Sequence, residues 1–243
     1  MNWLFLIEAL SPVAAIVLVW VCLLRFKRVA GRPRTLSELP HWLEEATLWC
    51  TSPLVYRLAK YSWMPTFFNG LGLTLSLIAG SLYALGTAPL AGWVLLLAGL
   101  SDTLDGRIAR QRKAASRRGA FTDSVLDRYS EMAIYTGLAW HFREGQGFFW
   151  VWAALFFSLM VSYTRARAEG LGYALKAGLM QRPQRLTLLI LASIFGPAAG
   201  IFQGSSDGAL LGAVGLIAIL TAFTAVHRFI AGCLSLEEKE NKP

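Results

Sequence analysis

Long apolar segments constrain the fold of this chain more than any other feature. From Thr66 onward, six stretches dominated by apolar residues follow one another, at about 66–86, 88–108, 120–141, 147–168, 186–203 and 208–230. A helix that crosses a bilayer needs about 20 apolar residues. Hydrophobic residues make up 55% of the chain and charged residues 16%, against about 45–50% and about 25% in a soluble domain. The sequence therefore predicts membrane-spanning helices.

A seventh apolar segment, Trp3–Leu24, precedes these six. Its positive charges begin at Arg25 and so follow the apolar run, whereas those of a signal peptide precede it. We interpret it as an uncleaved anchor whose N-terminus lies outside. The chain from Arg25 to Met64 is too polar to span, but apolar residues recur in it at helical spacing. These are Leu43, Ala46, Cys50, Leu54 and Leu58. They predict an amphipathic helix in the membrane interface, with a packed cytosolic helix hairpin as the alternative.

Basic residues mark the side of the membrane on which each loop lies. Arginines and lysines gather in the loops around 107–118 and 165–185, whereas the alternate connections carry few charges. By the positive-inside rule, these two loops and the C-terminal tail are cytoplasmic. The location expected is a cell inner membrane or plasma membrane, with a multi-pass chain. The net charge of +8 is spread between spans, so we expect membrane lipids and phosphorylated substrates as partners, and no nucleic acid.

The predicted fold class is all-α, a polytopic membrane helix bundle. Residues 1–27 form an N-terminal transmembrane anchor, and residues 28–64 a cytoplasmic linker with the interfacial amphipathic helix. Residues 65–232 form a six-helix core, and residues 233–243 a cytoplasmic tail. In the last span, Gly208 and Gly212 form a GxxxG pair, which indicates either close packing within the bundle or a dimer face.

Four aspartates lie where two of the predicted spans meet the cytoplasmic side. Asp102 and Asp105 end one span, and Asp123 and Asp127 begin the next. Residues three or four apart share a helix face, and antiparallel helices joined by a short loop bring both faces together. Four carboxylates at one depth repel one another unless cations neutralise them. Hard oxygen ligands suit Mg²⁺, Mn²⁺ or Ca²⁺. The aspartates therefore predict a divalent metal site.

Residues near these aspartates fit phosphate chemistry. Gly106 and Gly119 leave space where a ligand approaches the backbone. Arg110 lies two turns beyond Asp102 and is placed to reach a diphosphate. Two metal ions would clamp that diphosphate and stabilise the leaving group, while one carboxylate takes a proton. Glu131, one turn beyond Asp127, is expected to line the cavity or to pair with Arg128.

The whole pattern is Asp-x2-Asp-Gly-x2-Ala-Arg-x8-Gly-x3-Asp-x3-Asp, running from Asp102 to Asp127. It resembles the signature of the CDP-alcohol phosphatidyltransferase family, and the resemblance covers roughly residues 45–232. It implies a six-helix CDP-alcohol phosphotransferase core, Mg²⁺ or Mn²⁺ as two ions per active site, and a homodimer. It also implies transfer from a CDP-alcohol, usually CDP-diacylglycerol, to a second alcohol with release of CMP.

The resemblance assigns roles to individual residues. It makes Asp102 and Asp123 bridge both metals, Asp105 a ligand of one, and Asp127 a ligand of the other as well as the general base. Residues implied to contact the CDP-alcohol are Gly106, Arg110 and Ser116, with Gly119 beside them. Thr66 and Asn69 are added from Pro65-Thr66-Phe67-Phe68-Asn69, in which the two polar residues are exchanged relative to the family's usual order.

The acceptor alcohol is indicated by a later segment. Residues 162–170 and 181–186 look like the corresponding region of phosphatidylinositol-phosphate and archaetidylinositol-phosphate synthases, except that Gln181 stands where a glutamate is expected. The resemblance implies that arginines here bind the phosphate of an inositol phosphate. They are Arg165, Arg167, Arg182 and Arg185. Positive-inside topology alone is a second explanation for these arginines.

Other functions compete with this one. Glycerol 3-phosphate is the alternative acceptor, which would make the chain a phosphatidylglycerophosphate synthase, and an alcohol without phosphate comes third. A cation transporter with intramembrane carboxylates is a different class of function. A transporter does not explain Gly106, Arg110 and Gly119 at the family spacing, and an arginine beside the site would oppose the entry of cations.

Overall fold

The computed structural model describes residues 11–14, 17, 49, 51–112, 116–173, 175, 178–203 and 206–240. Regular structure in these residues is all helical. The six long helices are α3 (Met64–Ala84), α4 (Ala88–Gln111), α5 (Arg117–His141), α6 (Gly147–Gly170), α7 (Arg182–Gln203) and α8 (Ser206–Glu240). Each contains one of the six predicted apolar segments almost entirely, and the predicted all-α fold class is confirmed.

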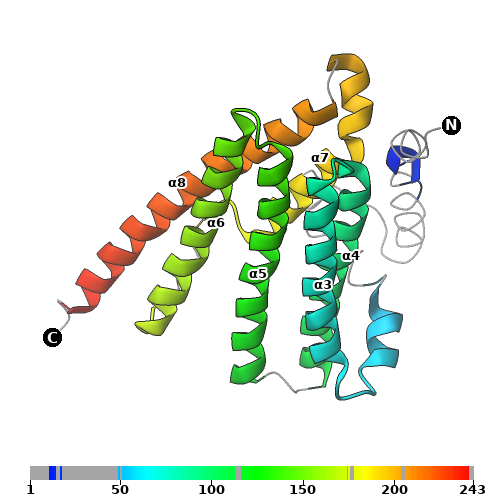
Figure 1. Ribbon diagram of the computed structural model, residues 1–243. Coiled ribbons are helices and arrows are strands. Elements are labelled where there is room, and N and C mark those ends of the chain that lie inside the picture. The colour runs from blue at the N-terminus through cyan, green and yellow to red at the C-terminus, as the bar shows by residue number, and fades with distance from the viewer. Residues whose placement is uncertain are drawn as a thin grey trace, which may run out of the picture.

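The six helices form a closed ring of neighbours (Figure 1). Helix α3 packs between α4 and α5, α4 packs on α7, α5 on α6, and both α6 and α7 on α8. The sequence predicts that α4 and α5 bring their faces together, but they make at most slight direct contact because α3 lies between them. Carboxylates of the two helices nevertheless come together, at Asp102 of α4 and at Asp123 and Asp127 of α5.

Local sequence explains where the helices begin. Pro65 lies in the first turn of α3 and Pro89 in the first turn of α4, positions at which a missing N–H costs no hydrogen bond. Ser116 caps α5, because its Oγ accepts a hydrogen bond from the Gly119 N–H at 3.0 Å. A core of buried residues, including Tyr83, Leu138 and Ile217, fills the space between the helices.

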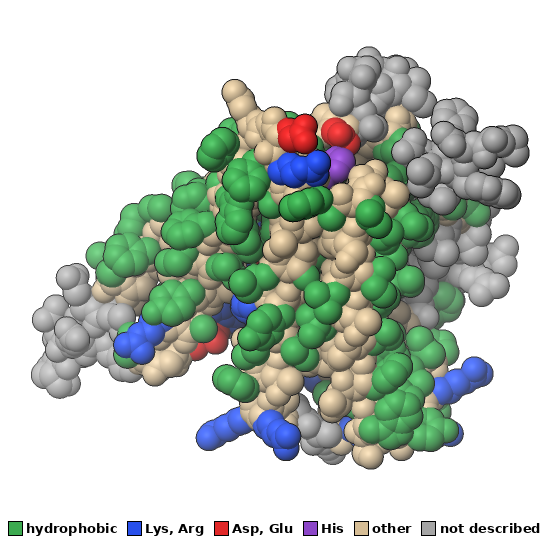
Figure 2. All heavy atoms as spheres, in the orientation of Figure 1, with side chains coloured by type: hydrophobic (Ala, Val, Ile, Leu, Met, Phe, Trp, Pro, Cys, Tyr) green, Lys and Arg blue, Asp and Glu red, His purple; other side chains and the backbone are tan. Residues whose placement is uncertain are grey.

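Three of the described helices are long and apolar enough to cross a membrane by composition: α3, α6 and residues Asp207–Ser235 of α8. The other three contain the motif aspartates, arginines or an internal proline. Figure 2 shows hydrophobic side chains over the middle of the visible face and Lys and Arg at its lower end. The chain is thus a multi-pass membrane protein, and the seven-span count stays a prediction.

The segments before α3 lie mostly outside the described residues. Of the predicted anchor, residues 11–14 and 17 are described, and the Ser11 hydroxyl donates to the Ile194 carbonyl of α7 at 3.1 Å. Of the predicted amphipathic helix, residues 51–58 are helical. Val55 is buried and packs with Leu104 and Ile108 of α4, Leu58 packs against the same cluster, and Leu54 is exposed. The predicted position of this helix in the membrane interface stays a prediction.

Arginines of α4 anchor this short helix. The Arg107 guanidinium donates to the hydroxyls of Thr51 and Ser52, and the Arg112 Nη1 donates to the Ala59 carbonyl at 2.6 Å. Residues 51–59 are therefore attached to the end of α4 that carries the aspartates. The proposed domain division at residues 27, 64 and 232 stays a prediction.

Candidate active site

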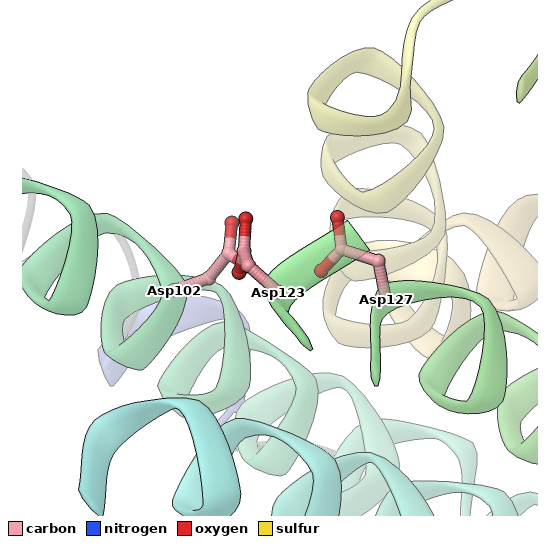
Figure 3. A group of neighbouring side chains, drawn as sticks. All are labelled: Asp102, Asp123 and Asp127. Carbon is pink, nitrogen blue, oxygen red and sulfur yellow. The ribbon is translucent and has the colours of Figure 1, made fainter. Parts of the chain in front are cut away.

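Three of the four predicted aspartates come together. Asp102 lies on α4, and Asp123 and Asp127 lie one turn apart on α5. Carboxylate oxygens of all three lie within 4.8 Å of one another, and Figure 3 shows the carboxylates of Asp102 and Asp123 adjacent, with Asp127 beside them. Carboxylates are the ligands preferred by hard divalent cations. The donor set therefore fits Mg²⁺ or Mn²⁺.

The fourth aspartate, Asp105, is separate from this group. It follows Asp102 by one turn on α4, is 7% exposed, and lines the pocket beside the cluster. Its predicted place as a ligand of one metal stays a prediction.

Arg182 lies inside the aspartate cluster, and its predicted contact with the acceptor phosphate stays a prediction. It begins α7, and its Nη1 lies 2.8 Å from Asp102 Oδ1 and 2.7 Å from Asp127 Oδ1. Arg182 precedes the predicted span 186–203. Burial disfavours its charged form, but Asp102 and Asp127 outweigh burial and raise the pKa of Arg182 above its usual range. The guanidinium therefore stays charged and neutralises part of the cluster.

A pocket of about 330 Å³, including its open mouth, lies beside the cluster. Helices α3, α4, α5 and α7 line it. The lining combines Asp102, Asp105, Asp127 and Arg182 with apolar residues such as Phe68, Leu95, Leu126 and Leu186. Charged and apolar residues thus line the same pocket, which suits a ligand that has both a polar and an apolar part.

The predicted CDP-alcohol contacts divide into two groups. Asn69 lines the pocket, and its Nδ2 donates to Asp123 Oδ1 at 3.4 Å, while Thr66 is exposed one turn earlier on α3. Gly106 lies under the Arg110 guanidinium, because a Cβ at this glycine would be 3.4 Å from Arg110 Nη1. These two residues lie outside the pocket lining.

Ser116 and Gly119 shape the start of α5 through the cap described above. A Cβ at Gly119 would lie 3.2 Å from Ser116 Oγ, so the glycine permits the close cap. The cap in turn fixes the turn of α5 that carries Asp123. Their predicted contact with the CDP-alcohol stays a prediction.

The remaining predicted arginines lie apart from the cluster. The Arg165 Nε pairs with Glu169 Oε1 at 2.8 Å on the exposed end of α6, and Arg167 is also exposed. Arg185 is 1% exposed, and its Nε donates to Glu131 Oε1 at 3.0 Å. The expected pairing of Glu131 with Arg128 is thus wrong, since the Arg128 Nη1 lies 3.6 Å from Asp127 Oδ2.

Sequence reasoning missed Arg228. This residue of α8 is buried, its Nη1 donates to the Val161 carbonyl at 2.6 Å, and it lies within electrostatic range of Arg165 and Arg185. The available signal was a charged side chain near the end of an apolar span, which is costly and marks a functional position.

Several known proteins are similar to this chain. The model of the family described as CDP-alcohol phosphatidyltransferase matches residues 63–229. The phosphatidylinositol phosphate synthase of Cutibacterium acnes is 38% identical over 145 residues, which cover 57% of this chain and 70% of that protein. The archaetidylinositol phosphate synthase of Methanothermobacter thermautotrophicus is 34% identical over 160 residues, covering 65% and 77%.

Solved structures of the phosphatidylinositol phosphate synthase of Mycobacterium tuberculosis share the fold. The structure with CDP-DAG bound has a TM-score of 0.64 and 29% identity, covering 75% of this chain and 92% of that one. The structure in complex with manganese and citrate has a TM-score of 0.65 and 28% identity, covering 75% and 88%.

Proposed function

Because this chain belongs to the CDP-alcohol phosphatidyltransferase family, we propose that it transfers a phosphatidyl group from CDP-diacylglycerol to a hydroxyl of an inositol phosphate and releases CMP. The chain is a membrane transferase of phospholipid biosynthesis. The observation that carries the proposal is the convergence of Asp102, Asp123 and Asp127 beside a half-apolar pocket. The relatives named above, one of them solved with CDP-DAG bound, support the choice of donor and acceptor.

Asp127 is the general base of the proposed reaction. It takes the proton of the acceptor hydroxyl as that oxygen attacks the phosphorus that carries the diacylglycerol. The new phosphorus–oxygen bond replaces the bond to the CMP phosphate, and CMP leaves with the electron pair of the broken bond. Two Mg²⁺ or Mn²⁺ ions held by Asp102, Asp105, Asp123 and Asp127 would supply Lewis-acid stabilisation of the diphosphate. Manganese in the solved M. tuberculosis enzyme supports a divalent metal.

Residues on three helices are proposed to bind the CDP part of the donor. Asn69 already lines the pocket, and Thr66 precedes it on α3. Arg110 is exposed on α4 with its guanidinium over Gly106, and we propose that it binds a phosphate of the donor. Ser116 and Gly119 begin α5 and hold Asp123 in place.

Arginines of α6, α7 and α8 are proposed to bind the acceptor phosphate. Arg165 and Arg167 lie on the exposed end of α6, where a soluble inositol phosphate arrives from water. Arg228 of α8 is buried and lies within electrostatic range of Arg165 and of Arg185. Clustered arginines that repel one another bind an anion favourably, because the anion relieves their repulsion.

The site is proposed to face the cytoplasm of a cell inner membrane or plasma membrane, as the basic loops around it suggest. We also propose a homodimer, as the family resemblance implies. A Cβ at Gly208 or Gly212 would meet no heavy atom of the described residues within 4 Å. The GxxxG pair therefore packs against none of the described helices and leaves that face for lipid or a second copy.

The test is release of CMP by the purified protein from CDP-diacylglycerol and Mg²⁺ with a panel of acceptors, with the lipid product identified by its mass. The panel contains inositol phosphate, glycerol 3-phosphate, inositol and serine. We expect turnover with inositol phosphate, and a raised KM for that acceptor in Arg167→Gln with an unchanged KM for CDP-diacylglycerol. Arg143→Gln, in the loop between α5 and α6, is the matched control. If glycerol 3-phosphate is the one acceptor that gives a product, then glycerol 3-phosphate and not inositol phosphate is the acceptor. If no acceptor leads to release of CMP, the proposed function is refuted.

A further inference from the structure

The Arg182 guanidinium supplies a positive charge inside the aspartate cluster. Its Nη1 lies 2.8 Å from Asp102 Oδ1 on α4 and 2.7 Å from Asp127 Oδ1 on α5, while the residue itself begins α7. One guanidinium nitrogen therefore joins three helices through two carboxylates. The contact with Asp102 is a charge-assisted hydrogen bond of normal length, and the contact with Asp127 is an ion pair.

The same carboxylates belong to the group that fits a divalent metal. A Mg²⁺ ion lies about 2.0–2.1 Å from its oxygen ligands, so an ion shared by Asp102 and Asp127 would lie in the space between their oxygens that Arg182 Nη1 enters. Two cations in that space repel each other strongly at low dielectric. The guanidinium and a metal shared by these two residues therefore exclude one another.

The guanidinium is not fully satisfied where it lies. Its Nε is buried and has no hydrogen-bond partner among the described residues, and a buried donor without a partner costs free energy. Arg182 also lines the pocket beside the cluster. A phosphate oxygen in that pocket would give the guanidinium an anionic partner to replace the carboxylates.

We propose that Arg182 is an internal counterion that competes with divalent metal for Asp102 and Asp127, and that the diphosphate of the donor relieves this competition by binding Arg182. The second half rests on the proposed function. Metal and donor then bind cooperatively, because each favours the position of Arg182 that the other requires. Arg182 is in this account a positioning residue that couples the two ligands.

The test is direct titration of Mn²⁺ into the purified protein without donor, followed by electron paramagnetic resonance. Arg182→Gln should bind Mn²⁺ more tightly than the wild type, by at least about fivefold, the lower end of common coupling between sites. Arg118→Gln removes the same charge from the exposed first turn of α5 and should change the affinity much less. Arg182→Lys keeps the positive charge, but a lysine bridges the two carboxylates less well than an arginine. Its Mn²⁺ affinity should therefore lie between those of the wild type and Arg182→Gln.

CDP-diacylglycerol supplies the second measurement. It should tighten Mn²⁺ binding to the wild type and have a smaller effect on Arg182→Gln. The proposal would be overturned if Arg182→Gln kept the wild-type helical content but bound Mn²⁺ no more tightly than the wild type. If the glutamine variant does not fold, the same result for Arg182→Lys would overturn it. The acceptor panel distinguishes this proposal from the proposed function. If the wild type releases CMP but the Arg182 variants bind Mn²⁺ with unchanged affinity, only the role of Arg182 is refuted. No CMP with any acceptor defeats the function and, with it, the role of the donor, whereas tighter Mn²⁺ binding by Arg182→Gln would still establish the competition between Arg182 and the metal.

Discussion

The ion pair of Glu131 and Arg185 is buried inside the bundle, where the two side chains are 3% and 2% exposed. Arg185 donates from Nε to Glu131 Oε1 and from Nη1 to the Met180 carbonyl, which fixes the loop before α7. The second glutamate oxygen, Oε2, is buried with no hydrogen-bond partner in the described part of the chain. Removing one partner of such a pair leaves an uncompensated charge at low dielectric.

Glu131→Leu should therefore destabilise the protein by about 3–5 kcal/mol, measured as thermal unfolding in detergent. The double variant with Arg185→Leu should lose less than the sum of the single losses, because neither charge is left alone. Glu169→Leu breaks the exposed pair with Arg165 and serves as the control, with an expected loss of about 1 kcal/mol or less. Unfolding of Glu131→Leu at the wild-type temperature would contradict a structural role for the pair.

Residue spacing explains which of these side chains the sequence could reveal. The aspartates could be predicted from the sequence, because helical spacing puts Asp102 and Asp105 on one face and Asp123 and Asp127 on another. Arg182 and Asp102 are 80 positions apart, and Arg185 and Glu131 are 54 apart. No periodicity links α7 to α4 or α5, so a single sequence predicted arginines near the site but not which carboxylate each one meets.

At the scale of elements, the crossing of α3 and α5 positions the aspartates. Gly80 and Gly137 face each other there, and a Cβ built at Gly137 would overlap the backbone of Gly80. Helices approach this closely only where small residues meet. The contact determines how far α5, and with it Asp123 and Asp127, stands from the pocket wall of α3.

Gly137→Ala should force the two helices apart and destabilise the protein by about 1–3 kcal/mol, the usual cost of overpacking. The loss of thermal stability should be accompanied by a lower rate of CMP release, since α5 carries two of the aspartates. Gly70→Ala adds the same methyl group to α3 where nothing lies within 4 Å, and it should lower neither quantity, because alanine is the better helix former. Equal behaviour of the two variants would rule out the close crossing as the element that positions the site.

The helices themselves were predictable because their apolar runs are long and bounded by charged or turn residues. The order in which they pack was not. The motif suggests that α4 and α5 pack together, but α3 lies between them, since the Gly80 and Gly137 contact draws α5 towards α3. Loop length restricts which helices can be neighbours but does not choose among them.

At the scale of the whole molecule, charge is distributed unequally between the two ends of the bundle (Figure 2). Arg117 and Arg118 begin α5 at the end where the aspartates lie. At its other end, His141 Nε2 lies 3.3 Å from Asp207 Oδ1, and Arg143 Nη2 lies 3.3 Å from Glu144 Oε1, so the arginine there is paired with a carboxylate. An excess of positive charge near the site predicts that this end is cytoplasmic.

Single cysteines test this orientation in a variant whose Cys22, Cys50 and Cys233 are replaced by alanine. A membrane-impermeant maleimide added to intact cells should label Gly145→Cys, in the loop between α5 and α6. Arg118→Cys should react only after the membrane is permeabilised. The reverse labelling pattern would show that the chain has the opposite orientation and that the site lies outside the cell.

The aspartate cluster is proposed to carry out a metal-dependent phosphatidyl transfer. Its most direct test is the rate of CMP release from CDP-diacylglycerol with inositol phosphate at saturating Mg²⁺, compared between the wild type and Asp127→Asn. Loss of a general base should lower the rate by about 10²–10⁴-fold, while Asp207→Asn at the opposite end of the bundle keeps the wild-type rate. A wild-type rate in Asp127→Asn, or CMP release that persists after all divalent metal is chelated, would contradict the account.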